Sequence, residues 1–360
     1  MDENRHGGNI YYAEMITGIP ASGIIDFSVN LNPLGTPAEL KNIIRDSLDE
    51  IMYYPDPAYT ASRSAIAAYH RVPIEYITTG NGATEIISLV CRVLKPAKAL
   101  IVAPSYSEYG RALKNTDAEI SYFRLRDEDG YKADIAALMT ELSGGYDLAV
   151  VCNPNNPTGT LISKDEILSL SEHCAESGCM LMIDESFMEF CFEGGNINSI
   201  IGPEMPQNIF AVRSLTKILS MPGLRIGYGV SSDNILNRKI AEYREPWTVS
   251  IPAAKAAEFL PKCSEFFERT RQTVSEENWF IKQRIGSIAW LKSYSSSVNF
   301  ILLKILNAMT SHEVSEILLR KGIPVRDASN FIYLNEKYIR VAVKDRESNT
   351  ALIDALNDIM

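Results

Sequence analysis

Apolar and polar residues follow two alternating patterns through the first two thirds of the chain. Short apolar runs bounded by glycine, proline, asparagine or serine predict buried strands at residues 99–105, 119–125, 146–157, 179–186, 208–215 and 224–232. Segments whose apolar residues recur every three or four positions predict helices at residues 37–54, 60–70, 84–94, 107–116 and 164–178. Because strands and helices alternate, the pattern predicts an α/β fold, a mostly parallel sheet wrapped by helices.

The two ends of the chain have a different character. Residues 1–36 form an arm rich in Gly, Asn and Pro, with one short predicted strand at 24–30. Beyond residue 251 comes a long helical region to about 285, then predicted strands at 297–306 and 338–344 beside helices at 311–322 and 349–360. We therefore expect an N-terminal arm (1–36) that packs with the small domain, a large domain (37–250) and a small α+β domain (251–360).

Composition excludes several classes of partner. The 360 residues carry a net charge of −10 and have a pI near 5.1, which argues against nucleic-acid and anionic-membrane partners, since both require a basic face. The opening MDENRHGGN lacks the pattern of a signal peptide, and no apolar run is long enough to cross a bilayer. The six cysteines are interpreted as free thiols in a reducing cytoplasm, and the spacing around His173 and Cys174 is not that of a zinc site.

The segment Gly80–Glu85 joins an apolar run to a predicted helix. Backbone N–H groups at a helix start bind phosphate, which makes Gly82 and Ala83 candidate phosphate ligands. A dinucleotide site is excluded because Glu85 stands where the third glycine would be. An ordinary strand–helix turn is the alternative interpretation of this segment alone.

Three further groups of polar residues follow predicted strands, where ligands bind in open α/β sheets. Asn156 lies in NNPTG, where two Asn-Pro pairs restrict the backbone. Asp184 ends an apolar strand, and burying it requires a cationic partner such as a protonated ring nitrogen. Lys217 lies in a small and apolar stretch between Ser214 and Arg225, and desolvation there lowers a lysine pKa and frees its amine.

The order of Asn156, Asp184, Lys217 in SLTK and the downstream GLRIGY resembles the fold-type-I enzymes that use pyridoxal 5′-phosphate (PLP), the class I/II aminotransferase superfamily. The resemblance covers nearly the whole chain. It implies that Lys217 holds PLP as a Schiff base and moves protons at the substrate Cα. It also implies that Asp184 pairs with the pyridinium nitrogen and that Asn156 bonds the ring 3′-oxygen.

The resemblance assigns other residues to the cofactor. Tyr106 would stack on the ring, and Gly82, Ala83, Ser214 and Arg225 would hold the cofactor phosphate. Tyr54 in YYPDP resembles the tyrosine that relatives lend to the partner subunit's phosphate, which implies a homodimer with shared sites. Without these motifs, packing would be the ordinary interpretation of both tyrosines. Many relatives carry tyrosine where this chain has Phe187.

Substrate anchors are expected at both ends of the chain. Arg340 resembles the family arginine that takes the substrate carboxylate, and Arg326 resembles the arginine that binds phosphate in subfamilies with phosphorylated substrates. In the N-terminal HGGN, Gly7 lets the backbone approach a ligand closely and His6 can donate to an anion. Asn32 and Asn156 are also candidate substrate contacts. A frayed terminus is the alternative for HGGN.

HGGN, DFSVNLNPLG, YYPDP, GNGATE and Phe187 together are similar to the threonine-phosphate decarboxylases of cobalamin biosynthesis. This implies that L-threonine O-3-phosphate loses CO₂ to give (R)-1-amino-2-propanol O-2-phosphate. Ala83 departs from the glutamate expected in that pattern. The histidinol-phosphate aminotransferases share Tyr54, Lys217, Arg326 and Arg340 and remain the alternative. A non-catalytic regulator would need a basic recognition helix, which the sequence lacks.

Overall fold

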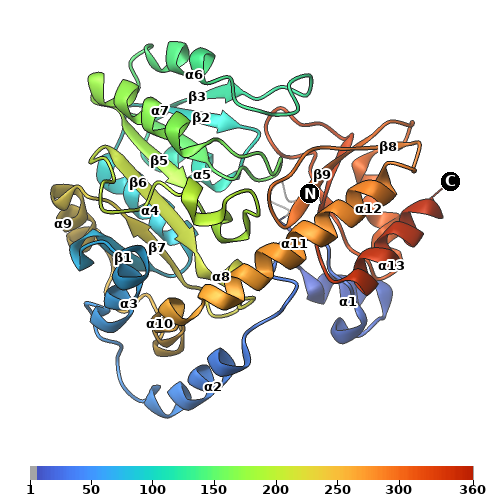
Figure 1. Cartoon of the computed structure of the whole chain (residues 1–360), viewed down its shortest axis with the longest axis horizontal. Helices are drawn as coiled ribbons and strands as arrows, with labels where there is room; N and C mark the ends of the chain where they lie inside the picture. Colours follow the sequence, from blue (N-terminus) through green and yellow to red (C-terminus); the bar gives the residue numbers. More distant parts are fainter. Residues whose placement is uncertain (1–5, 360) are drawn as a thin grey trace.

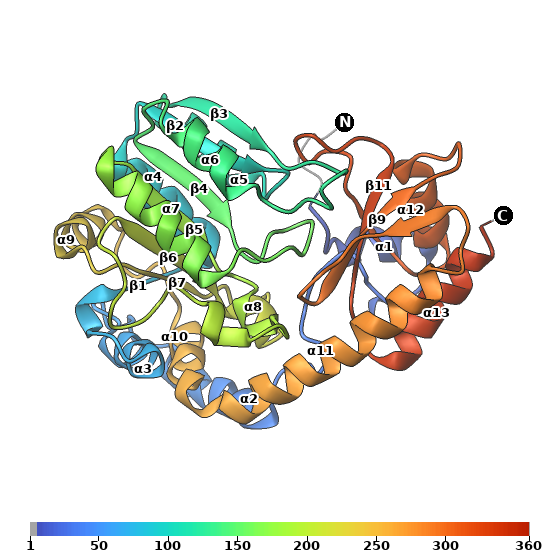
Figure 2. The same cartoon turned by 45° about the horizontal axis from the view of Figure 1, so that its top comes forward.

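The computed structural model describes residues 6–359 and consists of two bodies joined by the long helix α11 (Ser264–Ile285) (Figures 1 and 2). The larger body contains a seven-stranded sheet and the smaller one a four-stranded sheet. In Figure 2 the two sheets lie on the left and on the right of the molecule, with α11 running beneath them. Residues of both bodies line one cavity. This arrangement confirms the predicted fold class, a large body with a mostly parallel sheet and a smaller α+β body.

The strands of the large sheet run in the order β1-β7-β6-β5-β4-β2-β3. Neighbours from β6 to β3 pair in parallel, whereas β7 is antiparallel to both β6 and β1. All parallel strands therefore present their carboxyl ends at one edge, which faces the small body. The strands are β1 (Ile77–Gly80), β2 (Lys98–Ala103), β3 (Glu119–Arg124), β4 (Leu148–Cys152), β5 (Met180–Asp184), β6 (Ile209–Ser214) and β7 (Gly227–Val230).

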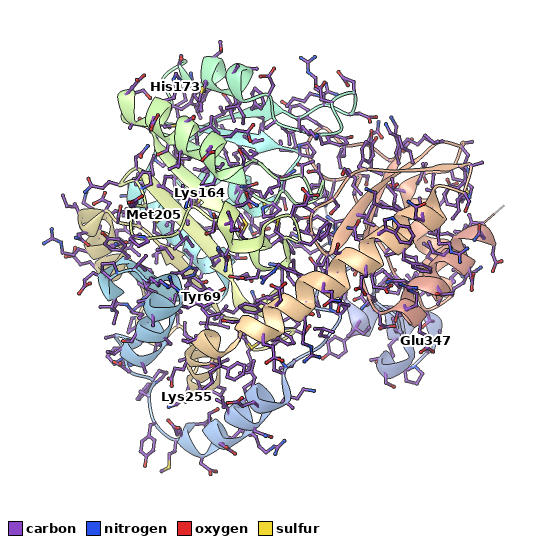
Figure 3. All side chains as sticks on the ribbon, in the orientation of Figure 1. Tyr69, Lys164, His173, Met205, Lys255 and Glu347 are labelled. Carbon is purple, nitrogen blue, oxygen red and sulfur yellow. The ribbon has the colours of Figure 1, made fainter. Side chains whose placement is uncertain are left out.

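Helices cover both faces of the large sheet because its strand residues alternate between two apolar cores. Val150 and Met182 pack toward α4, α5 and α9, while the adjacent Val151 and Ile183 pack toward α6 and α7. Figure 3 shows side chains filling the space between sheet and helices. The helices of this body are α2 (Ala38–Asp46), α3 (Thr60–His70), α4 (Ala83–Leu94), α5 (Glu108–Lys114), α6 (Ile135–Leu142), α7 (Lys164–Glu176), α8 (Leu215–Ile218), α9 (Asn234–Tyr243) and α10 (Ile251–Glu258).

The small sheet is antiparallel, in the order β10-β11-β9-β8. Its apolar face packs on the second half of α11 and on two C-terminal helices, through residues such as Ile281, Leu303 and Leu352. Its elements are β8 (Leu291–Ser293), β9 (Phe300–Ile305), α12 (Ser311–Arg320), β10 (Arg326–Asp327), β11 (Tyr338–Ala342) and α13 (Arg346–Asn357). Short 3₁₀ turns occur at Ala21–Gly23, Ser47–Glu50, Ile74–Tyr76, Met188–Phe190, Gly195–Asn198 and Leu260–Lys262.

The N-terminal arm carries α1 (Ile10–Thr17) and contacts the small body. The strand predicted at 24–30 is wrong. The Asp26 side chain accepts from the backbone N–H of Ser28 (2.8 Å), which closes a turn. Single backbone bonds still join this segment to the small body, including Phe27 N–H to the Pro324 carbonyl (2.8 Å). Helix α10 begins directly after the predicted boundary at 250 and packs on α2 and α3 of the large body. The domain boundaries at 36 and 250 stay predictions.

Within residues 6–359, no helix combines the length and the apolar character needed to cross a membrane.

Candidate active site

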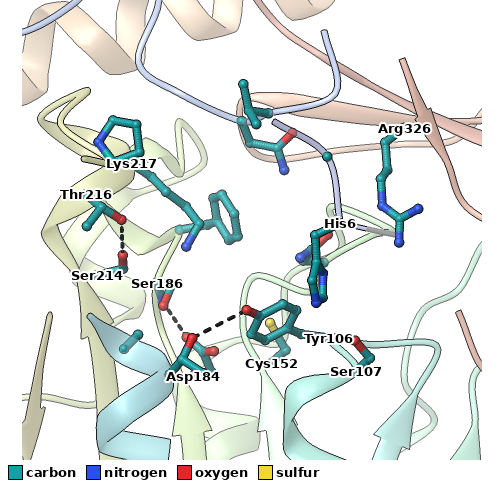
Figure 4. A pocket seen from close by; sticks show the side chains of 18 of the residues that line it. His6, Tyr106, Ser107, Cys152, Asp184, Ser186, Ser214, Thr216, Lys217 and Arg326 are labelled. Carbon is teal, nitrogen blue, oxygen red and sulfur yellow. Dashed lines mark hydrogen bonds between the residues drawn. The ribbon is translucent and has the colours of Figure 1, made fainter. Parts of the chain in front are cut away.

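A cavity of about 240 Å³ lies between the carboxyl ends of the large-sheet strands, the small sheet and the arm (Figure 4). Both bodies and the arm therefore contribute to one site. Eleven of the residues predicted from the sequence line it: His6, Gly7, Ala83, Tyr106, Asn156, Asp184, Ser214, Lys217, Arg225, Arg326 and Arg340.

Asp184 ends β5 on the floor of this cavity and is 4% exposed. Its Oδ2 accepts a hydrogen bond of 2.6 Å from the phenol of Tyr109, and its Oδ1 accepts one of 2.9 Å from the backbone N–H of Ser186. These two donors fix the orientation of the carboxylate. Each oxygen keeps a further acceptor position that a cationic N–H group can use.

Lys217 lies in the single turn of α8, directly after β6, and its amine points into the cavity (Figure 4). The Nζ atom is 5.1 Å from the centre of the Phe187 ring. Burial lowers the pKa of Lys217; Asp184 opposes this effect, and Arg225 adds to it. The neutral amine, which is the nucleophile in imine formation, is therefore more populated than in an exposed lysine.

The start of α4 and two nearby segments form an anion-binding corner. No side chain caps the helix at Gly82, which has a φ of 80°. A Cβ atom on Gly82 would lie 2.5 Å from the guanidinium of Arg225, so only glycine leaves room for this approach. The hydroxyls of Ser214 and Thr216 lie 2.8 Å apart on the same wall. Backbone N–H groups, hydroxyls and a guanidinium together suit a phosphate group.

Arg326 and Arg340 are cross-strand neighbours on β10 and β11, and both are more than 90% buried. Arg340 donates to Asn156 Oδ1 (2.5 Å) and to the Ser28 carbonyl (2.8 Å), while its buried Nε has no partner. Arg326 donates to Asn330 Oδ1 (2.6 Å). Within residues 6–359, neither guanidinium forms an ion pair with a carboxylate.

The electrostatics of this arginine pair favour anionic ligands. Burial, together with the neighbouring Arg326, lowers the pKa of Arg340 to about 9, and burial lowers the pKa of Arg326 to about 10. Two cations desolvated side by side are stabilised by an anion placed between them. The strand pairing thus builds a site for one dianionic group or for two neighbouring anionic groups.

The arm closes the outer side of the cavity. His6 Nε2 lies 3.1 Å from Glu108 Oε1, and the His6 and Tyr106 ring centres are 5.9 Å apart. Gly7 sits against the backbone, since a Cβ atom there would lie 2.3 Å from the Ser28 carbonyl oxygen. Tyr106 is held by a weak 3.4 Å contact between its hydroxyl and that of Thr84.

Two predicted residues lie away from the cavity of the single chain. The Asn32 amide donates to the Ile218 carbonyl and to the Thr270 hydroxyl (both 2.8 Å), so it supports the turn that carries Lys217 and does not face a substrate. Tyr54 is 80% exposed and packs against Trp247, with ring centres 4.8 Å apart and the rings tilted by 38°.

Sequence reasoning missed several residues that complete the site. Tyr109, Glu108 and Thr216 contact predicted site residues directly. Tyr109 follows Tyr106 by three positions; Tyr109 lies inside α5, Tyr106 lies two residues before it, and the two ring centres are 5.7 Å apart. Nothing in that spacing distinguishes a buried aromatic residue from a hydrogen-bond donor to Asp184.

Comparison with known proteins places this geometry in a family. The model of the aminotransferase class I and II family matches residues 22–356. The chain belongs to this family. It is 39% identical over 359 residues to a protein of Caldanaerobacter subterraneus subsp. tengcongensis provisionally named threonine-phosphate decarboxylase, covering 100% of this chain and 95% of the relative. It is 35% identical to the threonine-phosphate decarboxylase of Salmonella typhimurium, covering 99% and 96%.

A solved structure of the same family is also similar. The histidinol-phosphate aminotransferase from Clostridium acetobutylicum superposes with a TM-score of 0.86 at 29% identity, covering 93% of this chain and 99% of that chain. The predicted resemblance to the class I/II aminotransferase superfamily is therefore confirmed.

Members of this family depend on PLP, which is the cofactor predicted from the sequence. The residues of the cavity fit the group. The corner at Gly82 and Arg225 has the donors and the clearance that a phosphate needs. The oriented Asp184 carboxylate can accept from a protonated ring nitrogen, and the Lys217 amine opens on the same cavity.

Proposed function

We propose that the chain is a threonine-phosphate decarboxylase, which converts L-threonine O-3-phosphate to (R)-1-amino-2-propanol O-2-phosphate and CO₂ in cobalamin biosynthesis. The observation that carries this proposal is the pair of buried arginines, Arg326 and Arg340, in the cavity that Lys217 and the arm residues His6 and Gly7 also line. The substrate carries a carboxylate and a phosphate separated only by Cα, Cβ and the ester oxygen. The 39% and 35% identities to two proteins of that name support the same conclusion.

The two anions are divided between the two arginines in this proposal. Arg340 takes the carboxylate, because its contact with Asn156 brings it to the loop expected to touch the cofactor ring. Arg326 takes the phosphate with His6, which keeps one ring nitrogen toward Glu108 and can turn the other to the ligand. A bidentate arginine would fix the position of the carboxylate, and the Cα bond held perpendicular to the cofactor ring would be the one that breaks.

Lys217 and Asp184 are the proposed catalytic residues. PLP would be held through Lys217 until the substrate amine replaces the lysine, which leaves the Lys217 amine free. The cofactor would then supply an electron sink for the substrate Cα, and Asp184 would keep its ring nitrogen protonated. When the bond between Cα and the carboxylate breaks, the electron pair stays at Cα and CO₂ leaves. Lys217 then delivers a proton to Cα, which its lowered pKa as an ammonium group favours.

A homodimer with shared sites is the proposed assembly. Tyr54 lies in an apolar surface patch with Leu48, Ile51, Met52 and Trp247, each at least 46% exposed. Exposed apolar groups of this size favour a protein partner. In a symmetric dimer the Tyr54 hydroxyl would reach the partner's phosphate corner, as the family resemblance implies.

The cytoplasm is the proposed location. All six cysteines are free thiols and are buried, which suits a reducing compartment.

Histidinol-phosphate aminotransferase is the second candidate. The similarity in fold to the Clostridium acetobutylicum enzyme favours it, as does the phosphate-binding interpretation of Arg326. Histidinol phosphate has no carboxylate, so Arg340 would then serve only the second substrate, a dicarboxylic acid.

A paired assay separates the two functions. Purified enzyme is supplied with threonine phosphate alone, and separately with histidinol phosphate and 2-oxoglutarate. Under the proposal, CO₂ appears in the first reaction without any keto acid, and the second reaction is silent. Turnover of histidinol phosphate that depends on 2-oxoglutarate, with no CO₂ from threonine phosphate, would make the chain an aminotransferase.

A further inference from the structure

One carboxylate of the large body receives four donors from the small sheet. Asp127 lies in the loop after β3 and is a quarter exposed. It accepts from the hydroxyls of Tyr294 (2.5 Å) and Tyr338 (3.1 Å), from the Lys292 ammonium (3.2 Å) and from the Lys304 ammonium. Asp127 thus forms ion pairs and hydrogen bonds between the two bodies whose residues form the active site.

The register of the small sheet relates these contacts to the substrate anchors. Lys292, Lys304 and Tyr338 are direct cross-strand neighbours on β8, β9 and β11. Arg340 lies two residues after Tyr338 on the same face of β11 and pairs with Arg326 on β10. Two residues along a strand span about 7 Å. The cross-strand set Lys292, Lys304 and Tyr338, which Asp127 contacts, is therefore adjacent to the cross-strand pair Arg326 and Arg340.

Charge makes this contact depend on ionised Asp127. Without it, the ammonium groups of Lys292 and Lys304 would face each other across neighbouring strands. Partial burial raises the pKa of Asp127, but the hydrogen bonds from Lys304, Tyr294 and Lys292 outweigh this and lower the pKa below its ordinary value. The carboxylate stays negative at neutral pH and offsets the positive charges of Lys292 and Lys304.

We propose that Asp127 is a positioning residue, which holds the small sheet where Arg326 and Arg340 face Lys217 before substrate arrives. This inference rests on the proposed function for the identity of the substrate anions. The residues assigned to the cofactor, including Asp184 and Lys217, belong to the large body, so Asp127 acts on substrate affinity and not on the cofactor.

The kinetic test is Asp127→Asn, which removes the charge and preserves the size. KM for threonine phosphate should rise roughly tenfold or more, because a displacement of about 1 Å in binding groups is costly. The kcat value should fall by less than KM rises, since Lys217 and Asp184 stay in place. The dissociation constant and visible absorption of bound PLP should not change. Tyr294→Phe removes one of four donors and should raise KM by a smaller factor. This variant can be measured if Asp127→Asn does not fold.

A distance measurement provides a readout that does not need activity. The native cysteines are buried, so spin labels can be confined to Glu172→Cys on α7 and Arg320→Cys on α12, both exposed positions. Pulsed electron paramagnetic resonance should give one narrow distribution of distances between the two labels in the otherwise unchanged protein. The same pair of labels should give a broader or displaced distribution in Asp127→Asn.

The matched control is Asp358→Asn, which breaks a 2.9 Å ion pair with Lys321 inside the small body. It should leave KM and the distance distribution unchanged. The proposal requires both changes in Asp127→Asn; either one without the other, or loss of PLP in parallel, would overturn it. If the unsubstituted enzyme releases no CO₂ from threonine phosphate but its distance distribution still depends on Asp127, the proposed function fails alone. Competitive binding of inorganic phosphate then replaces KM as the affinity readout.

Discussion

At the scale of single residues, the orientation of Asp184 depends on a partner that no motif announces. The Tyr109 hydroxyl donates a hydrogen bond of 2.6 Å to the Asp184 carboxylate, and the Tyr109 side chain is fully buried in the apolar core. Burial, and then the negative charge of Asp184, raises the pKa of Tyr109 well above its ordinary value, so the phenol stays a donor. The Asp184 carboxylate, which we propose pairs with the ring nitrogen, is therefore held by a fixed neutral group.

The variant Tyr109→Phe tests whether this hydrogen bond matters, and Tyr106→Phe is its matched control. Both tyrosines border the site, but the Tyr106 hydroxyl makes only a 3.4 Å contact with Thr84. Loss of a hydrogen bond to a charged group costs about 1.5–3 kcal/mol, so Tyr109→Phe should lower kcat/KM about tenfold or more. Tyr106→Phe should stay within about twofold, because its weak contact contributes little. Equal losses in steady-state assays of the two variants would contradict this role.

The lowered pKa of Lys217 predicts how the apoenzyme takes up PLP. Burial is the main cause, Asp184 opposes it, and Arg225 and Arg340 add to it. The neutral amine dominates above the lowered pKa, so the uptake rate should rise with pH and level off below 10.5, the ordinary lysine value. Stopped-flow absorbance measures this rate. A rate that keeps rising beyond pH 10.5 would show an unperturbed lysine.

At the scale of secondary-structure elements, the sequence pattern predicted what local periodicity determines. The apolar run at 179–186 became β5, and the helical pattern at 164–178 became α7 with a capping box at Ser163 and Glu166. The run at 24–30 looked equally apolar, but Asp26 bonds the Ser28 backbone and turns the chain. A side chain that competes with the backbone for hydrogen bonds outweighs the strand pattern.

The candidate site was predictable where motifs end strands, and not where packing alone creates a contact. Asp184 ends β5 and Lys217 follows the neighbouring strand β6, so sheet topology brings them together. Asn32 and Asp127 lie in loops whose partners are more than a hundred residues away. Such contacts depend on how two bodies dock, which one sequence does not encode in any local pattern.

The arginine pair on β10 and β11 gives a prediction at the same scale. The reaction product has a phosphate and no carboxylate, so it reports on the phosphate anchor alone. Arg326→Gln should weaken product binding by about 2–4 kcal/mol, because a buried charge-assisted bidentate contact is lost. Arg340→Gln should leave product affinity within about threefold and raise KM for threonine phosphate. Product inhibition constants measure both effects, and the reverse pattern would exchange the roles of the two arginines.

At the scale of the whole molecule, the proposed homodimer predicts that Tyr54 completes the site of the partner subunit. Lys217→Ala and Tyr54→Phe should each be impaired, but a mixture unfolded and refolded together should regain activity. Half of the random dimers then carry one intact site of two, so up to about a quarter of full activity should return. Activity equal to the sum of the separate variants would mean that Tyr54 serves its own chain or no site.

The bond that breaks at Cα separates decarboxylation from transamination. L-Threonine O-3-phosphate labelled with ¹³C in its carboxylate, mixed with the PLP-loaded enzyme without keto acid, tests this by NMR. We expect the carboxylate signal to convert fully to labelled CO₂ and bicarbonate while 1-amino-2-propanol phosphate accumulates, and we expect no change with Lys217→Ala. A label that stays in the carboxylate, or moves into a keto acid once 2-oxoglutarate is added, would contradict the central claim.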